Sequence, residues 1–172
     1  GARLSEHPDV DLVSFTGGLA TGKAIMASAS GTVKRVALEL GGKNPNVVFA
    51  DADLPAAIDN ALTAVFLDSG QVCSAGTRLI VEESVHDEGV TELVRRAGLI
   101  RLGGSFDEDA ETGPLISDDH RDKVHAYVTD AVAEGAQLLT GGVIPDGDLA
   151  KGSYYPPTIL DGCTTTMRCV QD

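Results

Sequence analysis

The chain has 172 residues, of which 42% are hydrophobic and 23% are charged, which is the composition of a folded globular protein. Its formal net charge of −13 argues against a nucleic-acid partner, because phosphate backbones recruit Lys and Arg. No apolar run approaches the roughly 18 residues that a membrane helix needs, and no apolar core follows the basic residue near the start, as it would in a signal peptide. We therefore expect a cytoplasmic location, with no membrane association.

The first part of the chain predicts a strand, a glycine turn and a helix. Residues 10–15 are apolar enough for a buried strand, and residues 19–30 have the composition of a helix. The backbone N–H groups and the dipole at such a helix N-terminus favour an anion, so the turn is a generic cradle for phosphate. Gly17 and Gly22 have the spacing of a phosphate loop, but Ala24 stands where Ser or Thr would hold magnesium. The turn therefore does not indicate an ATPase. An ordinary strand-to-helix connection without a bound phosphate would have a similar sequence.

Apolar strands alternate with helices in the rest of the chain. The strands are expected at 32–40, 46–50, 78–81 and 137–139 and in an extended stretch at 154–160, and the helices at 56–67, 86–100 and 118–134. We expect Asp51 or Asp53 to cap the first of these helices, Ser117 to cap the last, and Gly135 to end it. Alternation of this kind favours an α/β architecture.

Cys73 is the residue around which a site can be built. It lies between Gly70 and Gly76, after an expected helix and before an expected strand. A cysteine thiolate is a strong nucleophile. Upstream, Glu39 ends an expected strand just before Gly41 and a second glycine, and glycines let another group approach the backbone closely. Because a carboxylate can act as a general base, the two residues suggest an enzyme that attacks a carbonyl through Cys73.

The remaining cysteines and the histidines give no sign of a metal site. Cys73, Cys163 and Cys169 make an odd number, which favours free thiols over a disulfide frame. Cys163 and Cys169 have no partner at ligand spacing, and the four histidines lie in polar surroundings and are expected to be solvated. Taken alone, Cys73 would also fit a small buried hydrophobic residue, as many free cysteines do.

Several motifs have the order and spacing of a known family. They are Phe15-Thr16-Gly17-Gly18, Glu39-Leu40-Gly41-Gly42-Lys43-Asn44-Pro45, Gly70-Gln71-Val72-Cys73, Thr112-Gly113-Pro114-Leu115-Ile116 and Tyr155-Pro156-Pro157-Thr158. Over essentially its whole length the chain resembles the aldehyde dehydrogenase superfamily. Glu39 and Cys73 are separated as the base and the nucleophile are in that family, and residues 73–78 are most similar to the betaine-aldehyde branch.

The resemblance implies a fold and a domain division. Residues 42–172 would form a three-layer α/β catalytic domain with a parallel-rich sheet, incomplete at its C-terminus. Residues 1–41 would be the last strand–helix–strand piece of a Rossmann-like cofactor domain. Family members also carry an upstream Asn and Lys and a downstream Glu-x-Phe-Gly-Pro motif, none of which is present here. We therefore expect a fragment of a longer parent enzyme, one that forms a homodimer or homotetramer.

The resemblance also implies an NAD- or NADP-dependent oxidation of a small-molecule aldehyde to a carboxylic acid. Cys73 would form a thiohemiacetal with the aldehyde, loss of hydride would leave a thioester, and Glu39 would activate the water that hydrolyses it. Gly18 departs from the family, which usually has Ser or Thr there. The residues that the resemblance assigns to the cofactor are Gly17, Gly18, Thr21, Gly22, Leu40 and Gly41.

Two alternatives stay open. The chain could be a non-catalytic, truncated module that keeps the fold. It could also belong to an acylating or reducing member of the superfamily, which uses the cysteine but dispenses with the glutamate. The presence of Glu39 favours hydrolysis to the acid. Neither the aldehyde nor the choice between NAD and NADP follows from these residues.

Overall fold

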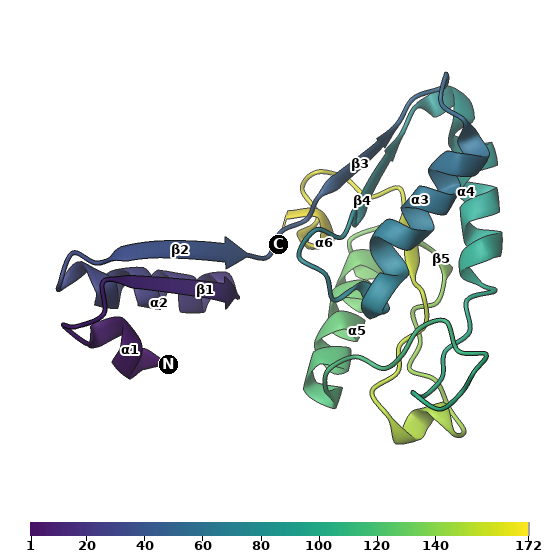
Figure 1. Cartoon of the computed structure of the whole chain (residues 1–172). Helices are drawn as coiled ribbons and strands as arrows, with labels where there is room; N and C mark the ends of the chain where they lie inside the picture. The colour runs from purple at the N-terminus through teal and green to yellow at the C-terminus, as the bar shows by residue number, and fades with distance from the viewer. Residues whose placement is uncertain (172) are drawn as a thin grey trace. The chain divides into compact units, whose positions relative to one another are not determined.

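The computed structural model describes residues 1–171 as two compact units, one of residues 1–42 and one that begins at Lys43 (Figure 1). The expected α/β class is confirmed. The strands form three two-stranded sheets within the described residues, two of them parallel and one antiparallel. No helix among residues 1–171 is long and apolar enough to cross a bilayer.

The unit of residues 1–42 is a strand–helix–strand motif preceded by a short helix. Strands β1 (Leu12–Gly17) and β2 (Arg35–Leu40) pair in parallel, and helix α2 (Leu19–Ser30) connects them. Helix α1 (Ala2–Glu6), which the sequence pattern did not predict, packs against α2. Figure 1 shows α2 lying along the two strands.

Strand β2 begins three residues later than the sequence pattern predicted. The expected strand covered residues 32–40, but the chain turns after α2, and Val33 has a left-handed φ of 55°. Residues with φ > 0 do not continue a strand, so pairing starts only at Arg35, opposite Leu12. The apolar Val33 is left 90% exposed.

Gly22 lets α2 pack closely on β2. A Cβ atom at Gly22 would lie 3.0 Å from Leu40 Cδ2 and 3.5 Å from Leu38 Cδ1. The side chains of β2 alternate, so Leu38 and Leu40 are half-buried while Glu39 between them is exposed. The helix therefore covers one face of the strand, and Glu39 points to the other face.

The second unit opens with another parallel pair. Strand β3 (Pro45–Val48) pairs with β4 (Arg78–Val81), and α3 (Leu54–Phe66) connects them. Asp53, one of the two predicted caps, accepts a hydrogen bond from the Ala56 N–H at 3.2 Å. A 3₁₀ helix, η1 (Leu67–Gly70), follows α3 and leads toward Cys73.

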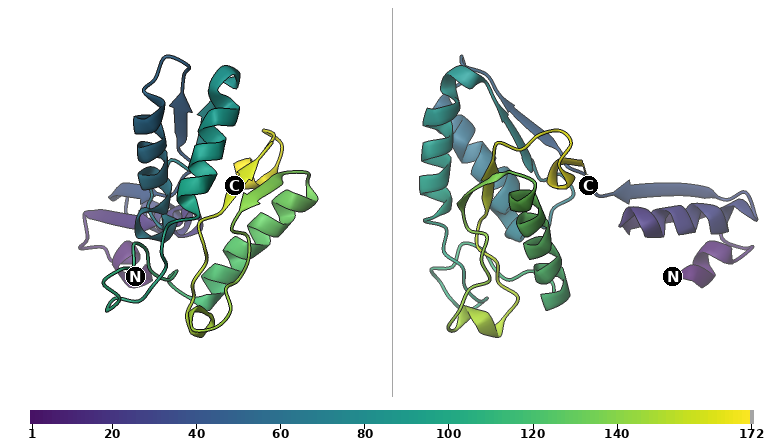
Figure 2. Two further views of the ribbon diagram at one scale, coloured as in Figure 1. Left: turned by 90° about the vertical axis from the view of Figure 1, so that its right-hand side faces the viewer. Right: turned by 180° about the vertical axis from the view of Figure 1, so that it is seen from behind.

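The rest of this unit combines longer helices with an antiparallel strand pair. Its elements are α4 (Glu83–Ala97), α5 (Asp118–Ala133), β5 (Gln137–Thr140), η2 (Leu149–Lys151), β6 (Ile159–Asp161) and α6 (Arg168–Gln171). Figure 2 shows α5 running beside β5 from two directions. Of the predicted extended stretch 154–160, only the end is paired, because Pro156 and Pro157 have no N–H to donate to a ladder.

Two small clusters of buried side chains hold this unit together. The first is Ile58 and Ala61 of α3 with Leu93 of α4, and half-buried Leu79 of β4 and Ile159 of β6 pack against it. The second joins α5 to α6 through Ala131, Ala136 and Met167. The first cluster fixes α3, whose end leads into the loop that carries Cys73.

Candidate active site

Cys73 is an exposed free thiol in the segment of residues 68–76, called here the cysteine loop, which joins α3 to β4. The loop begins with three consecutive left-handed residues: Asp68, Ser69 and Gly70 have φ values of 48°, 57° and 75°. For a non-glycine residue this conformation costs about 1 kcal/mol or more, and it persists only where surrounding contacts impose it.

Ser69 holds the start of the cysteine loop against a distant stretch of chain, residues 112–116, called here the 112–116 segment. The Ser69 hydroxyl donates to the Gly113 carbonyl at 2.7 Å and lies 2.9 Å from the Thr112 hydroxyl. The Gln71 N–H donates to the Asp68 carbonyl at 3.1 Å and closes the turn. These bonds offset the cost of the left-handed backbone.

The end of the loop is fixed by close packing on α3. The Gly76 N–H donates to the Ala64 carbonyl at 3.1 Å. A Cβ at buried Gly76 would lie 3.3 Å from Asn46 Cβ and 3.4 Å from Ala64 Cβ, so a larger side chain would press on both. Ala75 beside it is only 4% exposed.

The backbone of Cys73 is itself held. Asn44, just before β3, donates from Nδ2 to the Cys73 carbonyl at 3.2 Å. The Cys73 N–H has no hydrogen-bond partner among residues 1–171. The arrangement leaves both the thiol and this N–H open to a bound molecule. The sequence pattern predicted no role for Asn44, Ser69 or Gln71, although Asn44 and Gln71 lie within motifs shared with the family.

The described part of this unit contains cavities both near the cysteine loop and away from it. One of about 210 Å³ is next to the cysteine loop, and Ser69, Gly70, Gln71 and Tyr155 are among its lining residues. Another, of about 650 Å³, is lined by residues of α3, β4, α4, α5 and β6 and by Cys163. Its walls are mostly apolar side chains, so it has the character of a hydrophobic cavity.

The predicted cofactor residues gather at one edge of the unit of residues 1–42. Because β1 and β2 are parallel, their carboxyl ends meet, and Gly17 at the end of β1 lies opposite Leu40 at the end of β2. Gly18 is the N-cap of α2, Thr21 is exposed in its first turn, and Gly41 directly follows β2. Their role in binding a cofactor stays a prediction.

Glu39 lies in β2, exposed, opposite Thr16 of β1. It belongs to the unit of residues 1–42, whereas Cys73 belongs to the unit that begins at Lys43. That Glu39 serves as the base for Cys73 therefore stays a prediction.

His86 and His125, which were expected to be solvated, are half-buried and also contact protein side chains. His86 Nε2 lies 3.2 Å from Asp161 Oδ1, and His86 Nδ1 lies 3.0 Å from Asp87 Oδ1. Both contacts raise the pKa of His86, and the hydrogen bond to Asp87 has the larger effect. His125 Nδ1 lies 3.0 Å from the hydroxyl of Tyr155, and burial raises the pKa of Tyr155 to about 12.

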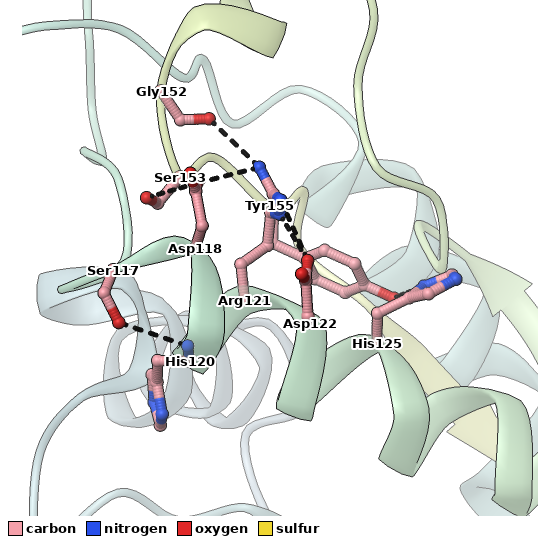
Figure 3. A network of polar contacts seen from close by, with 9 residues as sticks. All are labelled: Ser117, Asp118, His120, Arg121, Asp122, His125, Gly152, Ser153 and Tyr155. Carbon is pink, nitrogen blue, oxygen red and sulfur yellow. Dashed lines mark hydrogen bonds and ion pairs between the residues drawn. The ribbon is translucent and has the colours of Figure 1, made fainter.

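A polar network lies at the start of α5 (Figure 3), and Ser153 joins it to the 112–116 segment. Arg121, with its side chain only 14% exposed, bonds Asp118 at 3.0 Å and Asp122 at 2.8 Å. The Ser153 hydroxyl donates to the same Asp118 carboxylate at 2.8 Å, and the Ser153 carbonyl accepts from the Leu115 N–H at 2.9 Å. The predicted cap is confirmed, since Ser117 Oγ accepts from the His120 N–H at 3.2 Å.

Comparison with known proteins identifies the class to which this fold and this cysteine loop belong. Residues 1–172 match the model of the aldehyde dehydrogenase family, and the chain belongs to that family. Betaine aldehyde dehydrogenase of Bacillus subtilis is 57% identical over 173 residues, which cover all of this chain and 35% of that protein.

Solved structures give the same result. A 1.85 Å crystal structure of betaine aldehyde dehydrogenase from Staphylococcus aureus in complex with NAD⁺ matches with a TM-score of 0.97 at 49% identity, over 100% of this chain and 34% of that one. A 1.72 Å structure of a point mutant of the same enzyme, with NAD⁺ and a cysteine modified by β-mercaptoethanol, also has a TM-score of 0.97 at 49% identity, over 100% and 35%. The chain spans about a third of the length of these relatives.

Proposed function

We propose that this chain is part of an enzyme that oxidises an aldehyde to a carboxylic acid with NAD or NADP, and that Cys73 is its nucleophile. The observation that carries the proposal is the exposed Cys73 thiol, on a backbone held at its carbonyl by Asn44 and left open at its N–H. Betaine aldehyde, which the names of the relatives indicate for those proteins, is the substrate we propose. It is a cation, and the net charge of −13 suits its approach.

The chemistry begins at the cysteine. The Cys73 thiolate adds to the aldehyde carbon and forms the C–S bond of a thiohemiacetal. The Cys73 N–H donates to the oxygen, which carries negative charge in the transition state. NAD or NADP, when bound, accepts the hydride, and a thioester remains on the sulfur. Glu39 takes a proton from water, the water attacks the thioester, and the acid leaves while the thiol is regenerated.

The residues at the N-terminus of α2 fit the phosphates of a dinucleotide. The first hydrogen bond of the helix runs from the Gly22 N–H to the Gly18 carbonyl at 3.0 Å, so the N–H groups of the first turn precede the ladder. Gly18 gives no side-chain cap, a Cβ at that position would meet no atom within 4 Å, and the first turn has no acidic residue. An anion would therefore find free donors and no repulsion, although Gly18 offers no hydroxyl.

The test uses the complete protein in which this segment occurs, with reduced nicotinamide measured as the product. Cys73→Ala should bring the rate to background, whereas Cys163→Ala, the matched control, should leave it unchanged. Glu39→Gln should lower turnover by about 10²–10⁴-fold, the usual contribution of a general base. Full activity in Cys73→Ala would refute the proposal.

The fate of the thioester separates the enzymatic alternatives. In Glu39→Gln the acyl group should accumulate on the Cys73 peptide, where its added mass can be measured. An acylating or reducing member of the family would not need Glu39, and its turnover would not change. If the complete protein produces no reduced nicotinamide from an aldehyde, and Cys73 is alkylated no faster than Cys163 and Cys169, the non-catalytic alternative gains.

The isolated 172 residues are expected to have little or no dehydrogenase activity, because they span 35% of the length of the Bacillus subtilis relative. Rapid production of reduced nicotinamide by the isolated chain would contradict this. We further propose a cytoplasmic enzyme that forms a homodimer or homotetramer. Three free thiols suit a reducing compartment.

A further inference from the structure

Gln71, two residues before the candidate nucleophile, joins two parts of the molecule through its side-chain amide. Its Oε1 accepts a hydrogen bond from the Ile116 N–H at 2.8 Å. Its Nε2 donates to the Asp68 carbonyl at 3.3 Å. The Gln71 side chain therefore stabilises the left-handed turn at the start of the cysteine loop and connects that turn to the 112–116 segment by a hydrogen bond.

The 112–116 segment is held in place by hydrogen bonds to other parts of the chain. Besides the bond from Leu115 to Ser153, the Thr112 carbonyl accepts from the Gly103 N–H at 3.1 Å and the Thr112 N–H donates to the Arg101 carbonyl at 3.2 Å. The Leu115 side chain is 8% exposed. The segment is thus hydrogen-bonded both to residues 101–103 and to Ser153, so a group that bonds to it has a defined position.

We propose that Gln71 is a positioning residue for Cys73: its amide fixes the cysteine loop on the 112–116 segment and thereby sets the place of the thiol. This rests on the proposed function of Cys73 as nucleophile. Asp68 and Ser69 have left-handed backbones, and the two Gln71 bonds add to those of Ser69 in offsetting the cost of that conformation, so removing them leaves the loop less firmly held. Since Cys73 is only two residues further along, such loosening moves the sulfur, and a displacement of about 1 Å can cost about a hundredfold in rate.

Three variants of the complete protein test the proposal. Gln71→Met keeps the length of the side chain but removes both hydrogen bonds. Gln71→Glu keeps an oxygen acceptor for the Ile116 N–H and loses the donor to the Asp68 carbonyl. Gln137→Met makes the same change at an exposed position on β5 and is the matched control.

We expect kcat to fall by about 10- to 100-fold in Gln71→Met and by less in Gln71→Glu, with the KM for the nicotinamide cofactor within about twofold of the native value. Gln137→Met should match the native protein. A kcat for Gln71→Met within about twofold of the control, or a loss confined to the melting temperature, would overturn the proposal. A Gln71→Glu variant as slow as Gln71→Met would also overturn it, because the bond to Ile116 would then not matter.

A second measurement tests the positioning role of Gln71 separately from the proposed role of Cys73 as nucleophile. The rate of alkylation of Cys73 by iodoacetamide, followed on its peptide by mass spectrometry, needs no dehydrogenase activity. It should change several-fold in Gln71→Met, while alkylation of Cys163 in the same sample stays constant. If Cys73→Ala retained activity, the nucleophile assignment would fail, and alkylation alone would still report whether Gln71 sets the place of the thiol. An unchanged rate of Cys73 alkylation in Gln71→Met would refute the positioning role.

Discussion

The Cys163 thiol should react slowly with alkylating reagents, and its rate can be measured in the same protein that carries the candidate nucleophile. It follows β6, next to Asp161 and near Cys169 on the wall of the larger cavity. Cys163 is exposed as a residue, but loss of hydration around its sulfur, the neighbouring Cys169 thiol and the Asp161 carboxylate, in that order, raise its pKa from the ordinary 9.0 to about 11. The thiol is therefore protonated at neutral pH to a greater extent than an ordinary cysteine.

The size of the effect follows from two opposing terms. Two pKa units leave about a hundredfold less thiolate at neutral pH. A more basic thiolate is also intrinsically more nucleophilic, with a Brønsted slope of about 0.4–0.5, which returns roughly tenfold. The net expectation is alkylation about tenfold slower than that of an unhindered cysteine peptide.

The assay is alkylation by iodoacetamide at a series of pH values, read on the Cys163 peptide by mass spectrometry, with a short cysteine peptide as reference. The logarithm of the Cys163 rate should rise linearly with pH beyond about 9, where the reference levels off. In Cys169→Ala the rate at neutral pH should increase, because one of the groups that raise the pKa is gone. A Cys163 profile that levels off together with the reference would refute the reasoning.

Two further predictions concern stability. The raised pKa of His86 means that its contacts with Asp87 and Asp161 stabilise the fold fully below the ordinary value of 6.5, and that this contribution is lost as the pH rises through the raised pKa. In His86→Gln the melting temperature should lose that pH dependence, and an unchanged profile would contradict the assignment. Leu93→Ala, at a site 7% exposed, should lower the free energy of unfolding by about 2–5 kcal/mol, whereas Leu99→Ala, at a site 63% exposed, should change it by less than about 0.5 kcal/mol in denaturant titrations. Equal losses in the two variants would refute the assignment of Leu93 to the core.

Local chemistry made much of the fold predictable. The caps at Asp53 and Ser117 accept the N–H groups that helix ends leave free, and Gly135, with a left-handed φ of 110°, follows α5 as predicted. Each of these features depends on a few neighbouring residues. Boundaries were less reliable: α4 begins at Glu83, whereas the prediction placed its start at 86.

The site was predictable only in part. Cys73 stood out because of its glycine-rich surroundings and the motifs that the chain shares with a family. The left-handed backbone at Asp68 and Ser69 was not predictable, since neither residue is glycine and no local pattern demands φ > 0 there. That conformation depends on the Ser69 bonds to residues more than 40 positions away.

The amino-acid sequence by itself determined the α/β class, most of the helices and strands, the family and the identity of the candidate nucleophile, because these are written in short-range patterns and motifs. Only the tertiary structure decided that Gln71 meets Ile116, that His86 meets Asp161, and that Cys163 lies where its pKa is raised. The physical reason is separation: hydrogen bonds and desolvation join groups that are far apart along the chain, and no periodicity records which of them will meet.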